Sequence, residues 1–452
     1  MRMPRRAQLQ TRRAQRQPAG RNHAGIESSR ESEETLMDAP IRKLNRLRPA
    51  RSGTNRRSET ERECAAIRLE RWIQVIRNHL GMDVAFVSEF GQGRRLFRWV
   101  DSCLTDCPVV QGQSDPLEST FCQRVVDGRF PELMPCVPDL PEANALSRRL
   151  QLTVGAHLSV PITLKNGDVF GTFCCYSLQP NHGLGERDLA LMRAVAELVS
   201  HSIDDEREAK RHAIEARARI EHMLRSADGL RIVYQPIYNL IEERIVGYEA
   251  LARFQHGPAR GPDHWFAEAV ACGLGPDLEL KAIEIALGSL KRFPDRARVS
   301  INVSPETMLD HRLRSLLKPL PVQRIVLELT EHVATTCYAQ IADALTPLRA
   351  QGMQLAVDDA GAGHSSFLHI LSLSPDVIKL DIGLTRDIDR DPNRRFLATA
   401  LIGFAASAGV KIVAEGVERQ EELDTLKALG VQKAQGYYLG KPMTLDDALA
   451  LA

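Results

Sequence analysis

The chain has 452 residues, which suits two or three domains with one of them large. Apolar residues make up 43% of it and charged residues 26%, so it can bury a core and keep a solvated surface. It has neither an apolar run near the ~18 residues of a membrane helix nor an apolar signal-peptide core. Its nine cysteines are too scattered for a disulfide framework. We therefore expect a cytoplasmic protein.

The net charge of +1 is a cancellation between two parts of the chain. Residues 1–60 hold 15 basic and 6 acidic residues, whereas the rest holds 44 and 52. Because this first part is rich in Arg, Gln, Ser and Pro, we predict a disordered basic tail. It is interpreted as a solvated tail or as an extension ahead of a true start at Met37, with a basic arm for nucleic acid or anionic lipid as the alternative. We expect neither a membrane nor a nucleic acid as a partner.

Residues 61–205 are predicted to form one compact α/β domain. Its strongest local signal is Asn166-Gly167 between two apolar runs, because both residues tolerate a positive φ and so predict a hairpin. The expected elements are a helix over 62–80, strands over 84–90, 96–100, 154–164 and 169–178, and a helix from 186.

Several motifs in this domain resemble those of GAF domains attached to bacterial signalling enzymes. They are Ser119-Thr-Phe-Cys122, Gly128, Pro131 and the run from Ser159 to Thr172. The resemblance implies a six-stranded antiparallel sheet flanked by helices. It leaves the ligand of the domain unknown.

Six cysteines cluster between residues 103 and 175 of the same domain. They are Cys103, Cys107, Cys122, Cys136, Cys174 and Cys175. No spacing among them is CxxC and their neighbours are often apolar, so we predict buried core residues. A metal, haem or thiol redox site is the alternative.

The helix that begins near Glu186 is expected to continue into a polar helical linker over 206–228. A polar helix between domains is either a solvated spacer or the paired signalling helix of a dimer. We expect a homodimer in which the first domain acts through this helix.

From residue 229 to 452, short aliphatic runs alternate with helix-like stretches. The runs cover 232–236, 245–250, 299–303, 325–329, 353–358, 377–380, 411–414 and 433–438, and helices are expected over 277–293, 305–317, 338–351, 393–408 and 420–429. Eight such alternations predict a TIM-type (β/α)8 barrel, which places its active site where the strands end.

Polar residues stand at the ends of these runs. They are Gln235, Glu249, Asn302, Glu328, Asp358 with Asp359, Lys379 with Asp381, Glu415 and Gln435. Converging carboxylates are costly without a cation, and oxygen ligands favour Mg²⁺ or Mn²⁺ over zinc. Because adjacent Asp358 and Asp359 can bridge two ions, the pattern predicts a two-metal phosphodiester hydrolase.

The same residues resemble the signature of EAL-domain cyclic di-GMP phosphodiesterases. The matching motifs are Tyr234-Gln-Pro-Ile237, Glu249-Ala-Leu251, Ile301-Asn-Val-Ser304, Glu328-Leu-Thr-Glu331, Asp358-Asp-Ala-Gly-Ala-Gly363, Val377-Ile-Lys-Leu-Asp381, Glu415-Gly-Val-Glu418 and Gln435-Gly-Tyr437. The resemblance implies opening of cyclic di-GMP to linear 5′-pGpG with two Mg²⁺ or Mn²⁺ ions.

Carried over position by position, the resemblance implies a role for each residue. Glu249, Asn302, Glu328 and Asp358 would hold one metal, and Asp358, Asp359 and Glu415 the second. Lys379 would orient or deprotonate the attacking water, a role that Glu415 shares. For substrate binding, Gln235 and Gln435 would contact guanine, and Arg253 would contact a phosphate. Asp381 and Glu418 would support the second metal site. Glu331 would brace the loop after the fifth strand.

Two positions in that loop depart from the family pattern, because Ala360 and Ala362 stand where Phe and Thr are usual. The departure concerns loop packing and dimer-linked regulation, while every metal-ligand position keeps its expected residue type. The leading hypothesis is therefore a phosphodiesterase controlled by a GAF sensor. A catalytically silent receptor for cyclic di-GMP or a protein partner is the alternative.

Overall fold

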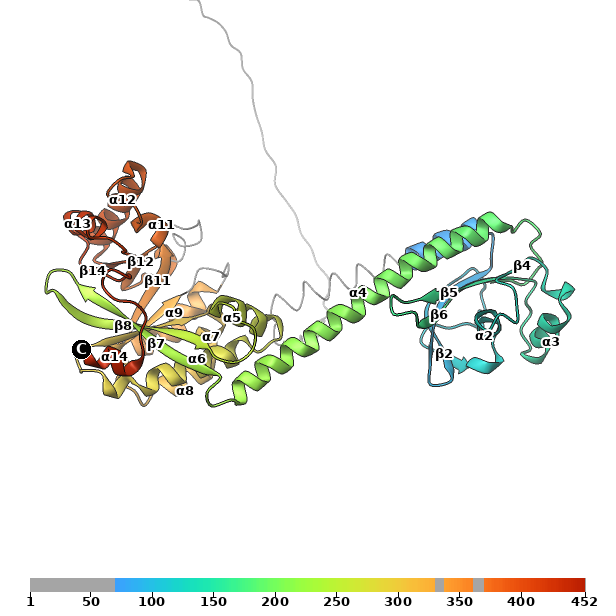
Figure 1. The fold of residues 1–452 in the computed structure, drawn as a ribbon, viewed down its shortest axis with the longest axis horizontal. Coiled ribbons are helices and arrows are strands. Elements are labelled where there is room, and N and C mark those ends of the chain that lie inside the picture. The colour runs from blue at the N-terminus through green and yellow to red at the C-terminus, as the bar shows by residue number, and fades with distance from the viewer. Residues whose placement is uncertain (1–69, 330–336, 361–369, 452) are drawn as a thin grey trace, which may run out of the picture. The chain divides into compact units, whose positions relative to one another are not determined.

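A computed structural model describes residues 70–329, 337–360 and 370–451 (Figure 1). The predicted tail over 1–60 with Met37, and the site residues Glu331 and Ala362, lie outside the described residues. Within them, no helix combines the length and the apolar character that crossing a membrane requires.

The N-terminal part is built on a six-stranded sheet in the order β3-β2-β1-β6-β5-β4, and every neighbouring pair is antiparallel. The strands are β1 (Val84–Gly91), β2 (Arg94–Ser102), β3 (Ser114–Pro116), β4 (Leu133–Met134), β5 (Ala156–Thr163) and β6 (Val169–Ser177). This confirms the predicted antiparallel sheet. The Asn166-Gly167 turn joins β5 to β6, and Gly167 has a φ of +88° that favours glycine.

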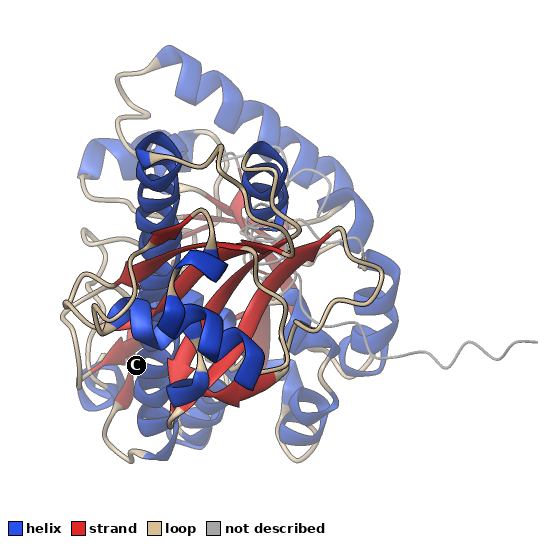
Figure 2. Ribbon diagram, turned by 90° about the vertical axis from the view of Figure 1, so that its right-hand side faces the viewer, coloured by secondary structure: helices blue, strands red, loops and turns tan. Residues whose placement is uncertain are grey.

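Helices lie against this sheet (Figure 2). The short helices are η1 (Leu117–Ser119), α2 (Phe121–Val126), η2 (Val137–Asp139) and α3 (Pro141–Arg149). The side chains of Cys174 and Cys175 leave β6 in opposite directions, as strand geometry requires. Cys174 therefore packs in the apolar cluster that includes α2, and Cys175 in the cluster that includes α4 (Glu186–Arg225) and the helix over 70–79.

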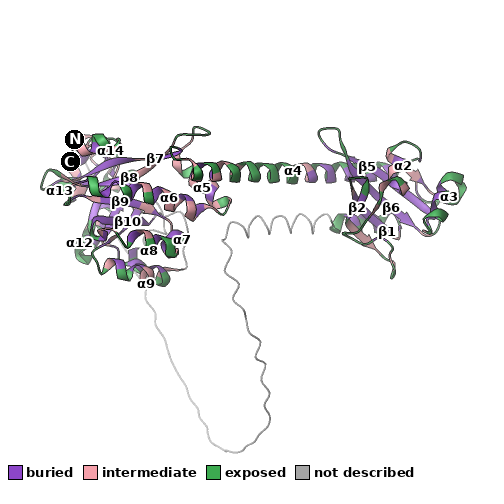
Figure 3. Cartoon of the chain, turned by 90° about the horizontal axis from the view of Figure 1, so that it is seen from below, coloured by how far each residue is buried: buried purple, intermediate pink, exposed green. Residues whose placement is uncertain are grey.

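Helix α4 is one continuous element of 40 residues, as the sequence predicts. Its N-terminus is capped by Asp188, whose carboxylate accepts from the N–H of Gly185 at 2.9 Å. Residues 205–215 in its middle are all exposed (Figure 3). In its last turns Ile220 and Met223 are buried in an apolar cluster with Trp265.

The C-terminal part is a closed eight-stranded barrel in the order β10-β11-β12-β13-β14-β7-β8-β9, which confirms the predicted barrel. The strands are β7 (Leu230–Asn239), β8 (Arg244–Phe254), β9 (Arg298–Val303), β10 (Ile325–Leu329), β11 (Gln354–Ala360), β12 (Val377–Leu380), β13 (Lys411–Ala414) and β14 (Lys433–Ala434). The helical segments are α5 (Pro262–Ala271), α6 (Gly275–Gly288), η3 (Leu290–Arg292), α7 (Pro305–Leu309), α8 (His311–Leu317), η4 (Val322–Arg324), α9 (Tyr338–Arg349), α11 (Ile382–Thr385), α12 (Pro392–Ala408), α13 (Gln420–Ala428) and α14 (Leu445–Ala450).

The barrel departs from eight regular alternations at its first strand. β7 is antiparallel to both β8 and β14, while the other neighbouring strands are parallel. Residues 240–243 are too few for the crossover that two parallel strands need, so β7 and β8 form a hairpin.

Among the differences from the predicted bounds, two have a local cause in the backbone. The last strand ends at Ala434, since at Gly436 φ is +156° and a Cβ would lie 2.2 Å from the backbone of Val417. The helix predicted over 305–317 is divided at Asp310, whose carboxylate accepts from the N–H of Arg312 at 2.8 Å and caps α8.

Candidate active site

The strands of the barrel carry polar side chains one layer above an apolar layer. Val326, Ala356, Val377 and Val413 belong to one buried cluster in the barrel. Two residues further along each strand, on the same face, stand Glu328, Asp358, Lys379 and Glu415, in the same order. The sequence thus brings three carboxylates and one lysine together from four neighbouring strands.

Lys379 is the centre of this arrangement, and its side chain is 1% exposed. Its Nζ lies 2.6 Å from Glu415 Oε1, 2.8 Å from Glu328 Oε2, 3.2 Å from Asp358 Oδ1 and 3.5 Å from Glu249 Oε2. Burial alone lowers the pKa of Lys379, but these four carboxylates outweigh it and hold the pKa well above its ordinary value. Lys379 is therefore an ammonium that donates hydrogen bonds.

The single ammonium of Lys379 supplies too little positive charge to balance the carboxylates around it. Burial raises the pKa of Glu415 well above its ordinary value and that of Glu328 to about 8, although Lys379 acts in the opposite direction. Five carboxylates, counting Asp359, face one ammonium and leave an excess of four negative charges when all are ionised. Such a cluster is stable at neutral pH when cations compensate it.

Adjacent Asp358 and Asp359 reach the same site because β11 is irregular. In a regular strand, consecutive side chains point to opposite faces. Here the pairing of β11 with β12 shifts between Val357 and Ala360, and Asp359 has a φ of +53°, which is rare outside glycine. The irregularity turns both carboxylates toward Glu415.

The carboxylates form two groups that share one member. Ligand oxygens of Glu249, Glu328 and Asp358 lie within 4.8 Å of one another, and so do those of Asp358, Asp359 and Glu415. All donors in both groups are carboxylate oxygens, which suit hard cations such as Mg²⁺ and Mn²⁺. The donor set and its excess charge fit two divalent cations joined by Asp358.

Two amides hold the carboxylates in place. Asn302 Nδ2 donates to Glu249 Oε1 at 3.1 Å, which leaves the Asn302 oxygen for another partner. Gln435 Nε2 donates to Glu249 and, at 3.1 Å, to Glu415 Oε1. The buried Oε1 of Gln435 has no hydrogen-bond partner among the described residues. Gln435 thus lies among the buried acids. The guanine contact that its motif implies stays a prediction.

The other predicted site residues have partners outside the cluster. Gln235 Nε2 donates to the carbonyl of Gly440 at 3.0 Å, and Arg253 donates to the carbonyl of Ala252 at 2.8 Å. Asp381 caps α11 by accepting from the N–H of Gly383 at 2.8 Å. Glu418 pairs with Arg386 at 2.6 Å. Among the residues that the structure describes, none of these four side chains forms a hydrogen bond or an ion pair with the carboxylates, so their roles toward a ligand stay predictions.

Two acids that the sequence motifs do not single out, one half-buried and one buried, support the backbone around the site. On α6, Glu279 accepts from Ser304 at its N–H and hydroxyl, at 3.0 and 2.8 Å, two residues after Asn302. On α13, Glu422 accepts from the N–H of Glu418 at 2.9 Å. Each is an acid on the buried face of a helix, and that isolated charge is the signal that could have revealed it.

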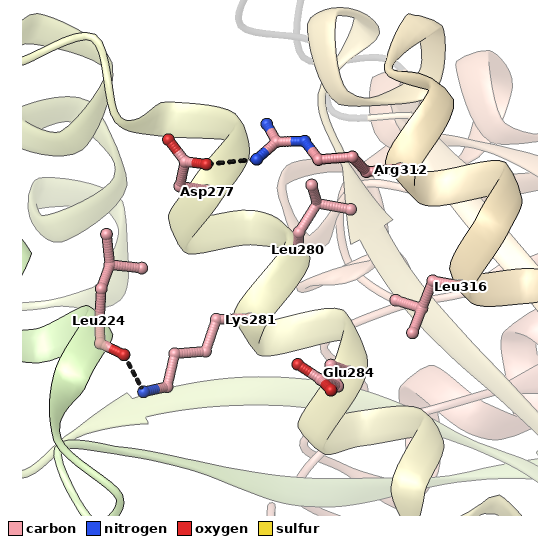
Figure 4. Close-up of a pocket in the computed structure, with 7 residues that line it drawn as sticks. All are labelled: Leu224, Asp277, Leu280, Lys281, Glu284, Arg312 and Leu316. Carbon is pink, nitrogen blue, oxygen red and sulfur yellow. Dashed lines mark hydrogen bonds and ion pairs between the residues drawn. The ribbon is translucent and has the colours of Figure 1, made fainter.

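Helix α6 also contacts the end of α4. Lys281 Nζ donates to the carbonyls of Met223, Leu224 and Ser226 at 3.2, 2.5 and 2.7 Å. Lys281 lines a hollow of about 540 Å³. Figure 4 shows its side chain reaching toward Leu224. Lys281 therefore caps the C-terminal carbonyls of α4, where a cation is favourable.

Known protein families match both the N-terminal and the C-terminal part of the chain. The EAL domain model matches residues 217–442 and the GAF domain model residues 68–204. The uncharacterized protein y4lL of Sinorhizobium fredii is 33% identical over 250 residues, which are 53% of this chain and 30% of that protein. The cyclic di-GMP phosphodiesterase PA2567 of Pseudomonas aeruginosa is 31% identical over 248 residues, 52% of this chain and 42% of that protein.

A solved structure shares the fold. The EAL enzyme Bd1971, in its form bound to cAMP and cyclic di-GMP, matches with a TM-score of 0.51 and 19% identity, over 82% of this chain and 93% of that one. The chain spans less than half the length of the two curated relatives. Since the EAL domain model covers half of the chain, this chain belongs to the EAL domain family and carries a GAF domain ahead of its EAL domain.

Proposed function

We propose that the EAL domain hydrolyses cyclic di-GMP to linear 5′-pGpG with two Mg²⁺ or Mn²⁺ ions. The observation that carries the proposal is the pair of carboxylate groups sharing Asp358 at the strand ends of the barrel. A cyclic dinucleotide brings two phosphodiester groups to a site, and two cations suit in-line displacement at one of them. The name of the Pseudomonas aeruginosa relative supports this choice of substrate.

The proposed metal ligands are Glu249, Asn302, Glu328 and Asp358 for one ion, and Asp358, Asp359 and Glu415 for the other. When bound, such ions acidify water and offset negative charge on phosphate oxygens.

The protein side chains contribute positioning and proton transfer. Lys379, held as an ammonium, orients the attacking water by donating a hydrogen bond, which favours its orienting role over deprotonation. Glu415, whose Oε1 lies 2.6 Å from Lys379 Nζ, takes the proton of that water on a carboxylate oxygen. Gln435 keeps the carboxylates of Glu249 and Glu415 in place. Gln235 and Arg253 contact the dinucleotide, and Asp381 and Glu418 support the second ion.

The test incubates full-length protein with cyclic di-GMP and Mg²⁺ or Mn²⁺ and separates the products. We expect linear 5′-pGpG from the wild type and none from Glu249→Ala, which lacks one charged ligand. Asp424→Asn on α13 is the matched control, because it removes an exposed carboxylate and should keep full turnover. Binding of cyclic di-GMP without product would refute the proposal and identify a silent receptor.

We further propose that the GAF domain sets the activity of the EAL domain through α4. The division of the chain is residues 61–205 for the sensor, 206–228 for the linker and 229–452 for the barrel. Helix α4 packs on the GAF core through Met192 and Val199, and its last turn is capped by Lys281 of the barrel. A ligand that shifts α4 would therefore change the environment of α6.

The exposed segment over 205–215 is the proposed pairing surface of a homodimer, because an uncovered polar helix between domains is either a solvated spacer or the paired signalling helix of a dimer. Analytical ultracentrifugation of the full chain tests this, and a monomer at working concentration would contradict it.

A further inference from the structure

Three side chains with metal-binding atoms meet inside the GAF domain. They are Cys122 on α2, His157 on β5 and Cys174 on β6, and a ligand atom of each lies within 4.8 Å of the other two. The residues are 0%, 3% and 0% exposed. The sulfur atoms of the two cysteines are 3.0 Å apart.

The sheet register explains how this cluster forms from distant positions. Ser159 lies directly opposite Cys174 in the pairing of β5 with β6, and His157 is two residues before Ser159, on the same face. Helix α2, which Thr120 caps by accepting from the N–H of Gln123, brings Cys122 onto that face. The three side chains thus come from three elements held by the domain core.

His157 is the observation that points to a ligand. Its Nδ1 is buried and has no hydrogen-bond partner among the described residues, although a buried polar atom left unpaired is costly. Its ring packs on Phe121 with centroids 5.1 Å apart, which holds it in place. A cation bound between the sulfurs and the imidazole would give this histidine nitrogen the partner that it lacks.

The charges around the cluster suit a bound divalent cation. Arg95 Nη1 donates to Cys122 Sγ at 2.9 Å, and Arg95 is itself paired with Asp115. Two thiolates, one neutral imidazole and one divalent ion sum to zero charge, which a buried site tolerates.

We propose that Cys122, His157 and Cys174 form a binding site for a thiophilic divalent cation of the zinc class. Ser159, whose Oγ is 2.8 Å from Cys174 Sγ, offers a fourth donor. Tetrahedral zinc with Zn–S bonds of about 2.3 Å separates two sulfurs by about 3.8 Å, so binding moves α2 away from β6 by a fraction of an ångström. The site is independent of the carboxylates in the barrel and of the proposed hydrolysis.

A disulfide between Cys122 and Cys174 is the competing reading. It would need the sulfurs to approach to about 2.05 Å. It would also leave His157 Nδ1 unpaired and Arg95 facing an uncharged sulfur. A bound cation engages all of these groups, so the cluster favours the cation.

The experiment titrates reduced, metal-free, full-length protein with Co²⁺ and records thiolate-to-cobalt charge-transfer absorption. We expect saturation at one Co²⁺ per chain and loss of the band when Zn²⁺ is added. The two carboxylate groups of the barrel contain no sulfur, so cobalt bound there is silent in this band. Cys174→Ser should abolish the band.

Cys175→Ser is the matched control, because Cys175 is the next residue on β6, is equally buried and packs on the other face, 3.9 Å from Met192 Sδ. It should keep the full band. Zinc-edge X-ray absorption of the wild type should count two sulfur ligands, which tests the site without any variant. Absence of sulfur ligation, or a band that survives in Cys174→Ser, would overturn the proposal. A Cys122–Cys174 disulfide with no cobalt band after reduction would overturn it as well.

Discussion

Replacing Lys281 by Met should loosen the end of α4 without touching the carboxylates of the barrel. The ammonium of Lys281 donates to the carbonyls of Met223, Leu224 and Ser226, with the shortest distance 2.5 Å. Methionine keeps the length and apolar contacts of the side chain but removes all three hydrogen bonds and the charge at the helix terminus.

The cost can be worked from these contacts. A hydrogen bond to a charged group contributes about 1.5–3 kcal/mol, and a cation at a helix C-terminus up to about 2 kcal/mol. Water in the adjacent hollow can satisfy the freed carbonyls, so the contributions do not add. We expect a loss of about 2 kcal/mol, which corresponds to about 30-fold more frequent opening of the last turn.

Hydrogen exchange of the full-length chain measures this opening. Peptides spanning 216–226 should exchange about 30-fold faster in Lys281→Met, while those from β10 and β11 should not change. Lys291→Met is the control, because Lys291 is exposed and makes no hydrogen bond or ion pair with any residue that the structure describes. Unchanged exchange at 216–226, or an equal change in both variants, would refute the capping argument.

Three further predictions concern the barrel. Glu328 and Glu415 have raised pKa values in the folded chain, so without metal the folded chain holds more protons than the unfolded chain. The unfolding temperature measured in a chelator should therefore fall as the pH rises from about 5 to 8. Mg²⁺ should remove this trend. Lys379→Met leaves the carboxylates uncompensated and should cost about 3–5 kcal/mol in a chelator but less with Mn²⁺; an equal loss in both conditions would contradict the charge argument. Glu422→Gln weakens an acceptor of three backbone N–H groups and should lower the unfolding temperature by thermal scanning, whereas Asp424→Asn on the same helix should not.

The positions of the barrel acids could be predicted because they follow a short-range rule. Val326 and Glu328, or Val413 and Glu415, are two residues apart, so they share a face in any strand. Parallel neighbours then bring the ends of successive strands together. Strand period and strand order therefore suffice to place Glu328, Lys379 and Glu415 at one site.

Features that depend on a backbone irregularity or on distant pairing could not be predicted in this way. Alternation would send Asp359 away from Asp358, and an aspartate gives only a weak signal for the positive φ that prevents it. The contact of Gln435 with Glu249 joins residues 186 apart in the chain. The approach of Cys122 to Cys174 likewise depends on the packing of α2 on the sheet, and the spacing of residues in the sequence does not predict that packing.

Helix α6 is the element through which the proposed control by α4 would reach the carboxylates without a direct contact. Lys281 and Glu279 are two residues apart, so they leave the helix roughly 200° apart and face opposite sides. Lys281 holds the end of α4, and Glu279 holds the N–H and hydroxyl of Ser304, two residues after Asn302. A helix is stiff along its axis, so a displacement of one side moves the other. The contacts that link α4 to Asn302 therefore consist of one rigid helix, α6, and the hydrogen bonds that Lys281 and Glu279 make on its opposite sides.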